Sequence, residues 1–270
     1  MKPAIILDKC YLFSAKKEAI HKLEDEYTIF LPLELIYEAF KDTDRERAKL
    51  FRKFRSGKSY KVLRSITEII KYEAKNKKPI AKPSKIYKPR DHSQHINYID
   101  DNYQLNENQK REIEQEMIFF DNIFNLFCEH SLKPGFQKKK EMGNNITNKQ
   151  DDFIIKDDKL KEIINHNIKK GYVSGFTNEI ENLDEKWFIF IHHKILDRMK
   201  FHIIKKYENF ETILKTPKTK EKVKHDIIDS FYLMQGILEG GFATDEKNLI
   251  EIYNEIVPNN ILITNKKKAL

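Results

Sequence analysis

The hydrophobic positions at both ends of the chain follow the pattern of buried strands that alternate with amphipathic helices. Short, mostly apolar runs occur at Ala4–Leu7 and Tyr27–Leu31, and again at Phe242–Thr244 and Ile261–Thr264. Such runs are typical of buried strands. The helices expected between them are Lys16–Asp25, Leu33–Phe40, Asp226–Leu238 and Glu246–Ile256. Strands that alternate with helices predict an α/β fold, with a mostly parallel sheet and flanking helices.

The middle of the chain has a different pattern, in which helical periodicity dominates. The helices expected there are Arg45–Arg55, Ser59–Ala74, Glu107–Glu129, Lys156–Lys169 and Glu185–Tyr207. Polar stretches that contain proline, Lys77–His95 and Lys133–Asp152, are expected to be loops. We therefore expect residues 1–43 and 225–270 to form one α/β domain, split by a large helical insertion at 44–224.

Composition narrows the class of protein. The chain has 270 residues and only two cysteines, Cys10 and Cys128, which does not resemble a secreted disulfide framework. No Cys/His spacing matches a zinc site, and His192 and His193 are expected to be ordinary helix residues. The first residues lack the apolar run of a signal peptide, and no stretch has the length of a membrane span. The expectation is a cytoplasmic protein without a membrane partner.

Carboxylates occupy the positions where an α/β protein would carry a site. Asp8 and Asp245 each follow a short predicted strand, and ligands of open parallel sheets bind at the carboxyl ends of strands. Asp226 and Asp229 are three residues apart, and so lie on one face of a predicted helix. Glu38 lies on the helix after the second strand. Neighbouring acids repel each other unless a cation bridges them, and Mg²⁺ prefers such oxygen ligands.

Each acid also has an ordinary structural explanation. Asp226 and Asp245 suit the N-cap of a helix, where a carboxylate accepts backbone N–H groups and complements the helix dipole. Glu34 and Glu38 fit solvated helix positions. The functional interpretation therefore rests on the whole set and its order along the chain: strand–Asp, helix–Glu, helix–Asp, strand–Thr-Asp.

That ordered set resembles the PIN-like nuclease family. The matching segments are IILD at 5–8, LPLELIYEAF at 31–40, DIIDSFYLMQGILEGG at 226–241 and FATDEKNL at 242–249. The resemblance implies that the acidic metal-binding positions of the family correspond to Asp8, Glu38, Asp229 and Asp245. It leaves Asp226 as a competing or additional acid and Glu34 as the alternative to Glu38. The chain departs from the family in its long insertion and in Asp8-Lys9-Cys10, where Asp-Thr-Asn or a relative is usual.

The chemistry implied by this resemblance is metal-dependent cleavage of phosphodiester bonds. Carboxylate-held Mg²⁺ or Mn²⁺ acidifies water for attack on phosphorus, so no Ser or His nucleophile is needed. RNA is the favoured substrate because the resemblance implies it. The alternatives are a DNA nuclease, an effector nuclease of a toxin or defence system with an antitoxin-like protein regulator, and a non-catalytic module that binds nucleic acid.

Positive charge is concentrated in one stretch. The chain carries a formal charge of +8, with a pI near 9.1. Residues 45–90 hold 17 Lys and Arg against three acids, a net charge of +14 that exceeds the total for the whole chain. This localisation predicts a phosphate-binding face. The residues expected to contact nucleic acid are Arg45, Arg47, Arg52, Lys53, Arg55, Lys58, Lys61 and Arg64. Tyr60, Tyr72 and Tyr87 are candidates for stacking on bases, although core or rim positions fit them equally.

Overall fold

The computed structural model describes residues 2–86, 95–143, 146, 149–171 and 175–265. Its contacts divide the chain into two compact units. The first, the α/β unit, comprises the described residues of Met1–Asn106 and Phe231–Leu270. The second, the helical unit, comprises those of Glu107–Ser230. The α/β fold class expected from the sequence is confirmed, because the first unit contains a parallel sheet flanked by helices.

The α/β unit is built on a five-stranded sheet in the order β3-β2-β1-β4-β5, and every neighbouring pair is parallel. Its strands are β1 (Ala4–Leu7), β2 (Thr28–Leu31), β3 (Tyr60–Val62), β4 (Gly241–Ala243) and β5 (Ile261–Ile263). Its helices are α1 (Lys9–Ser14), α2 (Lys17–Glu26), α3 (Leu33–Lys41), α4 (Asp44–Phe51), α5 (Ile66–Asn76), α6 (Pro83–Ile86), α7 (His95–Ile99) and α15 (Lys247–Ile256). The central strand is β1, whose Ile5, Ile6 and Leu7 are completely buried.

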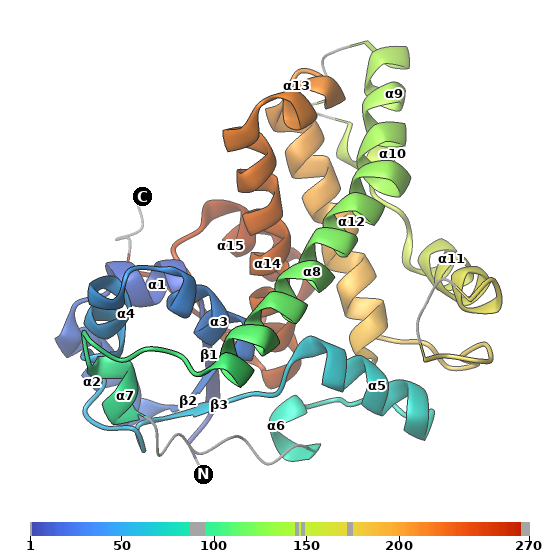
Figure 1. Ribbon diagram of the computed structural model, residues 1–270. Coiled ribbons are helices and arrows are strands. Elements are labelled where there is room, and N and C mark those ends of the chain that lie inside the picture. The colour runs from blue at the N-terminus through green and yellow to red at the C-terminus, as the bar shows by residue number, and fades with distance from the viewer. Residues whose placement is uncertain (1, 87–94, 144–145, 147–148, 172–174, 266–270) are drawn as a thin grey trace. The chain divides into compact units, whose positions relative to one another are not determined.

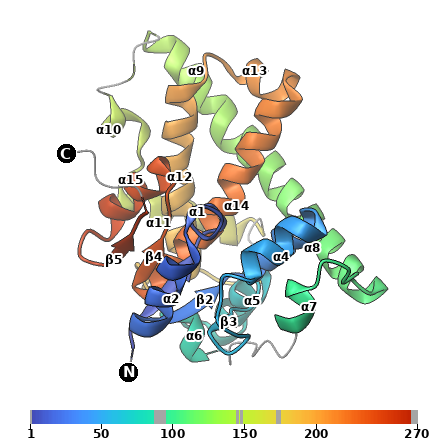
Figure 2. The ribbon, with the colours of Figure 1, turned by 90° about the vertical axis from the view of Figure 1, so that its left-hand side faces the viewer.

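The helix α15 packs on the strands that precede and follow it (Figure 2). The Tyr253 ring stacks on Phe242 of β4 with 5.7 Å between ring centroids, and the Tyr253 hydroxyl donates to the carbonyl of Ile261. These contacts close the β4–α15–β5 crossover against the sheet.

The helical unit consists of helices and their connections. Its elements are α8 (Glu107–Phe127), η1 (Cys128–Leu132), α9 (Lys133–Glu141), α10 (Gln150–Phe153), α11 (Asp157–Lys169), α12 (Phe188–Lys206) and α13 (Phe210–Lys215). The π-helical turn η1 joins α8 to α9 without a break, and α9 lies beside α12 (Figure 1). The long helix α14 (Pro217–Glu239) begins in this unit and ends in the α/β unit.

Several expectations from the sequence need correction. The strand β3 lies inside the stretch 59–74 that was expected to be one helix, because Tyr60 and Val62 are apolar in strand alternation around the exposed Lys61. The α/β unit therefore extends through residue 106 and is larger than the expected 1–43 and 225–270. The stretch Lys133–Asp152, expected to be a loop, contains α9, where proline is tolerated in the first turn of the helix. The helix expected from Asp226 begins earlier, at Pro217.

No helix among the described residues is both long and apolar enough to cross a membrane.

The junction of β1 and β4 depends on a glycine. A side chain at Gly241 would collide with the backbone carbonyl of Ala4, an atom that cannot move without displacing β1. We predict that Gly241→Ala lowers the free energy of unfolding by about 1–3 kcal/mol, the usual cost of overpacking a buried site. Urea unfolding measures this change, and equal stabilities of Gly241→Ala and wild type would contradict the described register.

Candidate functional site

The acids lie where the order of the strands in the parallel sheet reverses. The chain runs outward from β1 through β2 to β3, and then returns to place β4 on the other side of β1. In an open parallel sheet, the crevice beyond the strand ends at such a switch point is the usual ligand site. Asp8 follows β1 and Thr244-Asp245 follows β4, so the two acidic segments lie on either side of this point.

Asp8 is held at the switch point by the strand register. Leu7 pairs with Ala243, and the Asp8 N–H donates to the Ala243 carbonyl at 3.0 Å, so Asp8 lies next to Thr244. The Thr244 hydroxyl donates to Asp8 Oδ2 at 2.7 Å. Asp8 is also the N-cap of α1, since its Oδ1 accepts the N–H of Cys10 at 3.3 Å. The side chain is completely buried.

Burial raises the pKa of Asp8 from the ordinary 3.8 to about 7. Loss of hydration is the largest cause, because it penalises the ionised form. The hydrogen bonds from Thr244 and Cys10 lower the pKa, and the negative charges of Glu246 and Glu38 raise it further. Asp8 is therefore a desolvated carboxyl group under the influence of other negative charges, an arrangement that a bound cation would relieve.

Asp245 is also buried, but both of its oxygens accept hydrogen bonds from other segments. Its Oδ1 accepts the backbone N–H of Asn265 at 2.7 Å, and its Oδ2 accepts the Asn265 side-chain amide at 3.2 Å and the Ser14 hydroxyl. Asp245 thus ties the end of α1 to the segment after β5. It does not cap α15 as its position in the sequence allowed, because the N-cap residue is Glu246.

The two glutamates of α3 are both buried but have different hydrogen-bond partners. Glu38 is 5% exposed and its Oε2 accepts the hydroxyl of Tyr232 from α14. Glu34 is completely buried, and accepts the N–H of Ile66 at 2.9 Å and the amide of Gln235 at 3.2 Å. Glu34 therefore links α3 to the start of α5 and to α14. The alternative explanation, that these glutamates occupy solvated helix positions, does not hold because both are buried.

Glu246 is a member of the group that the sequence analysis did not select. It is exposed, and its charge contributes to the raised pKa of Asp8. It also hydrogen-bonds to the Cys10 side chain, whose pKa is raised to about 12, first by burial and then by the charges of Asp8 and Glu246. The sequence does place Glu246 directly after Thr244-Asp245, which could have suggested a role at the site. An acid at the start of a helix is common, however, so this position alone did not identify it.

Asp226 and Asp229 lie on the part of α14 that belongs to the helical unit. Asp226 and Asp229 are both partly buried, and the charge of Asp226 adds to burial in raising the pKa of Tyr207. The acids that the α/β unit itself brings to the switch point are therefore Asp8, Glu38 and Asp245, with Glu246 added.

The donor chemistry of this group suits a hard divalent cation, because carboxylate oxygens are the ligands that Mg²⁺ and Mn²⁺ prefer. Within the described part of the chain, no set of three or more His, Cys, Asp or Glu side chains is arranged to hold a metal ion. The charge and burial of Asp8 thus fit a cation, while its present hydrogen bonds to Thr244 and Cys10 must lengthen for its oxygens to coordinate one.

The basic stretch divides into internal and exposed residues. Arg47 is 1% exposed, donates to Asp44 and to the carbonyl of Asp100, and lies over the Phe40 ring at 4.9 Å. Its assignment as a phosphate contact is corrected, because a guanidinium buried in this way anchors α4 to the segment near Asp100. Arg64 pairs with Glu68 at 2.9 Å, one helical turn away.

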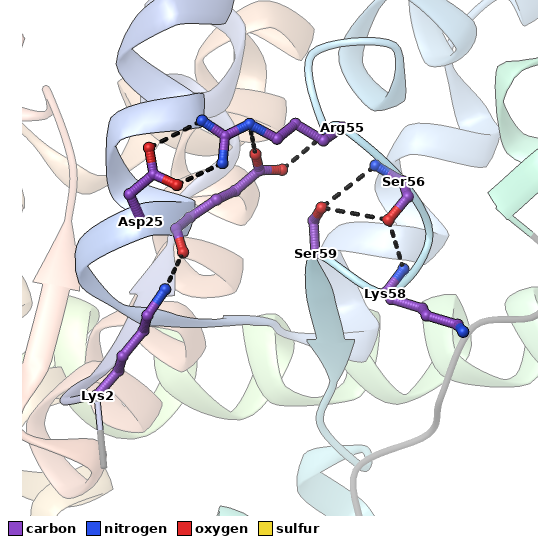
Figure 3. A network of polar contacts seen from close by, with 7 residues as sticks. Lys2, Asp25, Arg55, Ser56, Lys58 and Ser59 are labelled. Atoms are coloured by element: carbon purple, nitrogen blue, oxygen red, sulfur yellow. Dashed lines mark hydrogen bonds and ion pairs between the residues drawn. The ribbon is translucent and has the colours of Figure 1, made fainter.

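Three further cations of the stretch have intramolecular partners. Arg52 pairs with Asp101 at 2.9 Å. Lys53 donates to the last carbonyls of α1 at 2.6 and 2.7 Å. Arg55 bridges Asp25 and Glu24 (Figure 3).

Of the predicted set, Arg52 and Arg55 are exposed but form the ion pairs described above, and Arg45, Lys58 and Lys61 are exposed as well. Figure 3 shows the Lys58 side chain extending away from its loop, while its backbone N–H donates to the Ser56 hydroxyl. Lys61 lies on the edge strand β3, where a lysine also prevents pairing with another chain.

The structure bears on two of the three tyrosines proposed to stack on bases, and on His192. Tyr60 is buried, and its hydroxyl lies 3.1 Å from His95 Nδ1, so it is not a stacking surface. Tyr72 is partly buried, and Tyr87 lies outside the described residues. His192 is buried in α12 and burial lowers its pKa to about 3, which keeps it neutral.

Comparisons with family models, with curated proteins and with solved structures returned no match to this chain.

The structure predicts different consequences for the two glutamates of α3. Glu34→Ala removes the acceptor of two buried donors, each of which costs about 1–3 kcal/mol when left unpaired. We therefore expect Glu34→Ala to lower the free energy of unfolding by at least that amount in urea titrations. The control, Glu18→Ala on exposed α2, should change it by only a few tenths of a kcal/mol. A Glu34→Ala protein as stable as the control would show that this network does not support the fold.

The raised pKa of Asp8 predicts how stability depends on pH without metal. Between pH 4 and 7 the folded protein binds a proton at Asp8 that the unfolded chain has released. The contribution of Asp8 is therefore fully present below pH 4 and is lost as pH rises through about 7. We expect the stability of Asp8→Asn relative to wild type to increase across this window, measured by urea unfolding in EDTA. A constant difference between pH 4 and 8 would contradict the raised pKa.

Proposed function

We propose that this chain is a metal-dependent nuclease of the PIN-like type. The observation that carries the proposal is Asp8, a completely buried carboxyl group at the switch point of a parallel sheet, with Glu38 and Glu246 as charged neighbours. Asp8 caps α1 and bonds to Thr244, but its burial near other acids destabilises the ionised form, a cost that these two hydrogen bonds offset only in part. Functional sites commonly tolerate such strain.

The residues that would hold Mg²⁺ or Mn²⁺ are Asp8 and Glu38, with Glu246 able to reach the same region from the exposed side. When bound, the ion supplies a Lewis acid that acidifies water and neutralises charge on the phosphodiester. Thr244 orients Asp8 through its hydroxyl, and Tyr232 orients Glu38. Asp245 positions the end of α1 and the Asn265 segment around the site. Roles for Asp226 and Asp229 remain part of the proposal through the resemblance of their segment.

RNA is the proposed substrate, and this choice rests on the family resemblance alone. A DNA nuclease or an effector nuclease regulated by an antitoxin-like partner would use the same acids. A binding module without activity is the candidate from another class. The acidic residue at each position of the ordered set is compatible with an active enzyme, and the burial of Asp8 among other acids is the feature that favours one.

The first test of the proposal is metal dependence. We expect cleavage of a labelled RNA or DNA strand in Mg²⁺ or Mn²⁺, and none in EDTA. Asp8→Asn should retain binding of the strand and lose cleavage by orders of magnitude, because an amide cannot supply the charge that holds the ion. Glu18→Ala is the matched control and should cleave as wild type does. Full activity of pure Asp8→Asn protein would refute the proposed chemistry.

A second test separates phosphate contacts from structural cations. Replacing Arg45, Lys58 and Lys61 together with glutamine should weaken binding of single strands without loss of stability. Each lost contact should make the log–log salt dependence shallower by about 0.7, or about 2 for all three. The cleavage rate at saturating substrate should change little, because these residues lie outside the acidic group.

The matched control replaces Arg52, Lys53 and Arg55 with glutamine. These cations pair within the protein, so this variant should lose stability and keep the salt slope. Identical salt slopes for wild type and the Arg45, Lys58 and Lys61 variant would exclude these residues as a phosphate-binding face.

A further inference from the structure

The helix α1, which Asp8 caps, carries a large aromatic side chain that is exposed to solvent. Phe13 of α1 is 56% exposed, and it is the only exposed large aromatic side chain in the described part of the chain. The neighbouring residues Tyr11 and Leu12 are buried in the core. α1 therefore presents one ring to solvent while its other apolar residues pack against the fold.

The position of this ring is fixed by the same helix that Asp8 caps. Phe13 follows Asp8 by five residues, which corresponds to about 7.5 Å along a helix axis. The next residue, Ser14, donates to Asp245 and accepts the side-chain amide of Asn265 at 3.2 Å. A ligand that reaches the acids from this side of α1 would therefore meet the Phe13 ring.

Cations contact Phe13 at its ring and at its backbone carbonyl. The Lys49 ammonium lies over Phe13, 5.7 Å from the ring centroid. The Lys53 ammonium donates to the carbonyl of Phe13 at 2.7 Å, which stiffens the end of α1 beneath the ring. Arg45 lies one turn before Lys49 on α4 and is exposed. An exposed aromatic face combined with cations is the combination that binds a single strand, in which bases stack and phosphates pair.

We propose that Phe13 is a stacking platform for an unpaired base of a single-stranded nucleic acid, with Lys49 and Arg45 beside it as phosphate contacts. The identity of the ligand as a nucleic acid rests on the proposed nuclease function. A duplex offers no free base face, because its bases are paired and stacked on each other. Phe13 therefore makes the site selective for single strands while it tolerates any base.

The experiment measures binding in EDTA, where no cleavage occurs, to a short single strand that carries a fluorescent base analogue. Stacking of a base on an aromatic ring contributes about 1–3 kcal/mol, so Phe13→Ala should weaken binding about 5- to 160-fold. It should also reduce the quenching of the base analogue. Phe13→Trp should restore both, since it retains a stacking face. Binding to a duplex of the same sequence should change less than about twofold.

The matched control is Ile96→Ala, which removes another exposed apolar side chain of the α/β unit, 74% exposed, and should leave binding unchanged. RNA and DNA strands are compared, and a preference for either is compatible with stacking. Equal single-strand affinity for Phe13→Ala and wild type would overturn the proposal, as would an equal loss for duplex or no single-strand binding by wild type.

These outcomes distinguish failure of the stacking platform from failure of the nuclease proposal. Cleavage by wild type in Mn²⁺, together with unchanged single-strand binding by Phe13→Ala, refutes the platform and leaves the nuclease standing. Binding that depends on Phe13 without cleavage in any divalent metal refutes the nuclease and leaves the platform.

Discussion

The hydrogen bond from Thr244 to Asp8 joins the two central strands at the point where the sheet changes direction. It depends on the β1–β4 register, which in turn requires the close approach of Gly241 to Ala4. A carboxyl group so deeply buried is costly unless hydrogen bonds or a cation stabilise it. The structure supplies two hydrogen bonds and places further negative charge nearby, so the fold carries at Asp8 a site whose electrostatics favour a cation.

The other buried acids differ in their hydrogen-bond partners, and therefore in their roles. Glu34 and Asp245 satisfy backbone N–H groups of other segments, and so hold α5 and the chain after β5 in place. Glu38 instead accepts from a tyrosine hydroxyl and contributes charge at Asp8. In this account Asp8 and Glu38 carry the chemistry, while Glu34 and Asp245 fix the frame around them.

The pattern of apolar residues in the sequence predicted those strands and helices in which this pattern is clear. The strands β1, β2 and β5 and the helix α3 have clear apolar periods and were placed to within a residue or two at each end. The strand β3 was missed because its three residues lie beside helix-forming sequence, and only pairing with β2 identifies it. The sequence placed Arg47 among the phosphate contacts because it lies in a basic stretch. Its burial against Asp100 and Phe40 is a tertiary contact, which a count of charges along the chain cannot predict. The acids at strand ends were predictable from topology, whereas the separate roles of Glu34 and Glu38 required side-chain partners.

The central claim is that the acids at the β1–β4 switch point hold a divalent cation. The most direct test is anomalous diffraction from crystals of the wild-type protein soaked in Mn²⁺. The account predicts a manganese peak at coordination distance, about 2.0–2.2 Å, from a carboxylate oxygen of Asp8, with Glu38 as a second ligand. A strong peak elsewhere, with the Asp8 carboxyl still bonded to Thr244 and Cys10 and no ion beside it, would contradict the account.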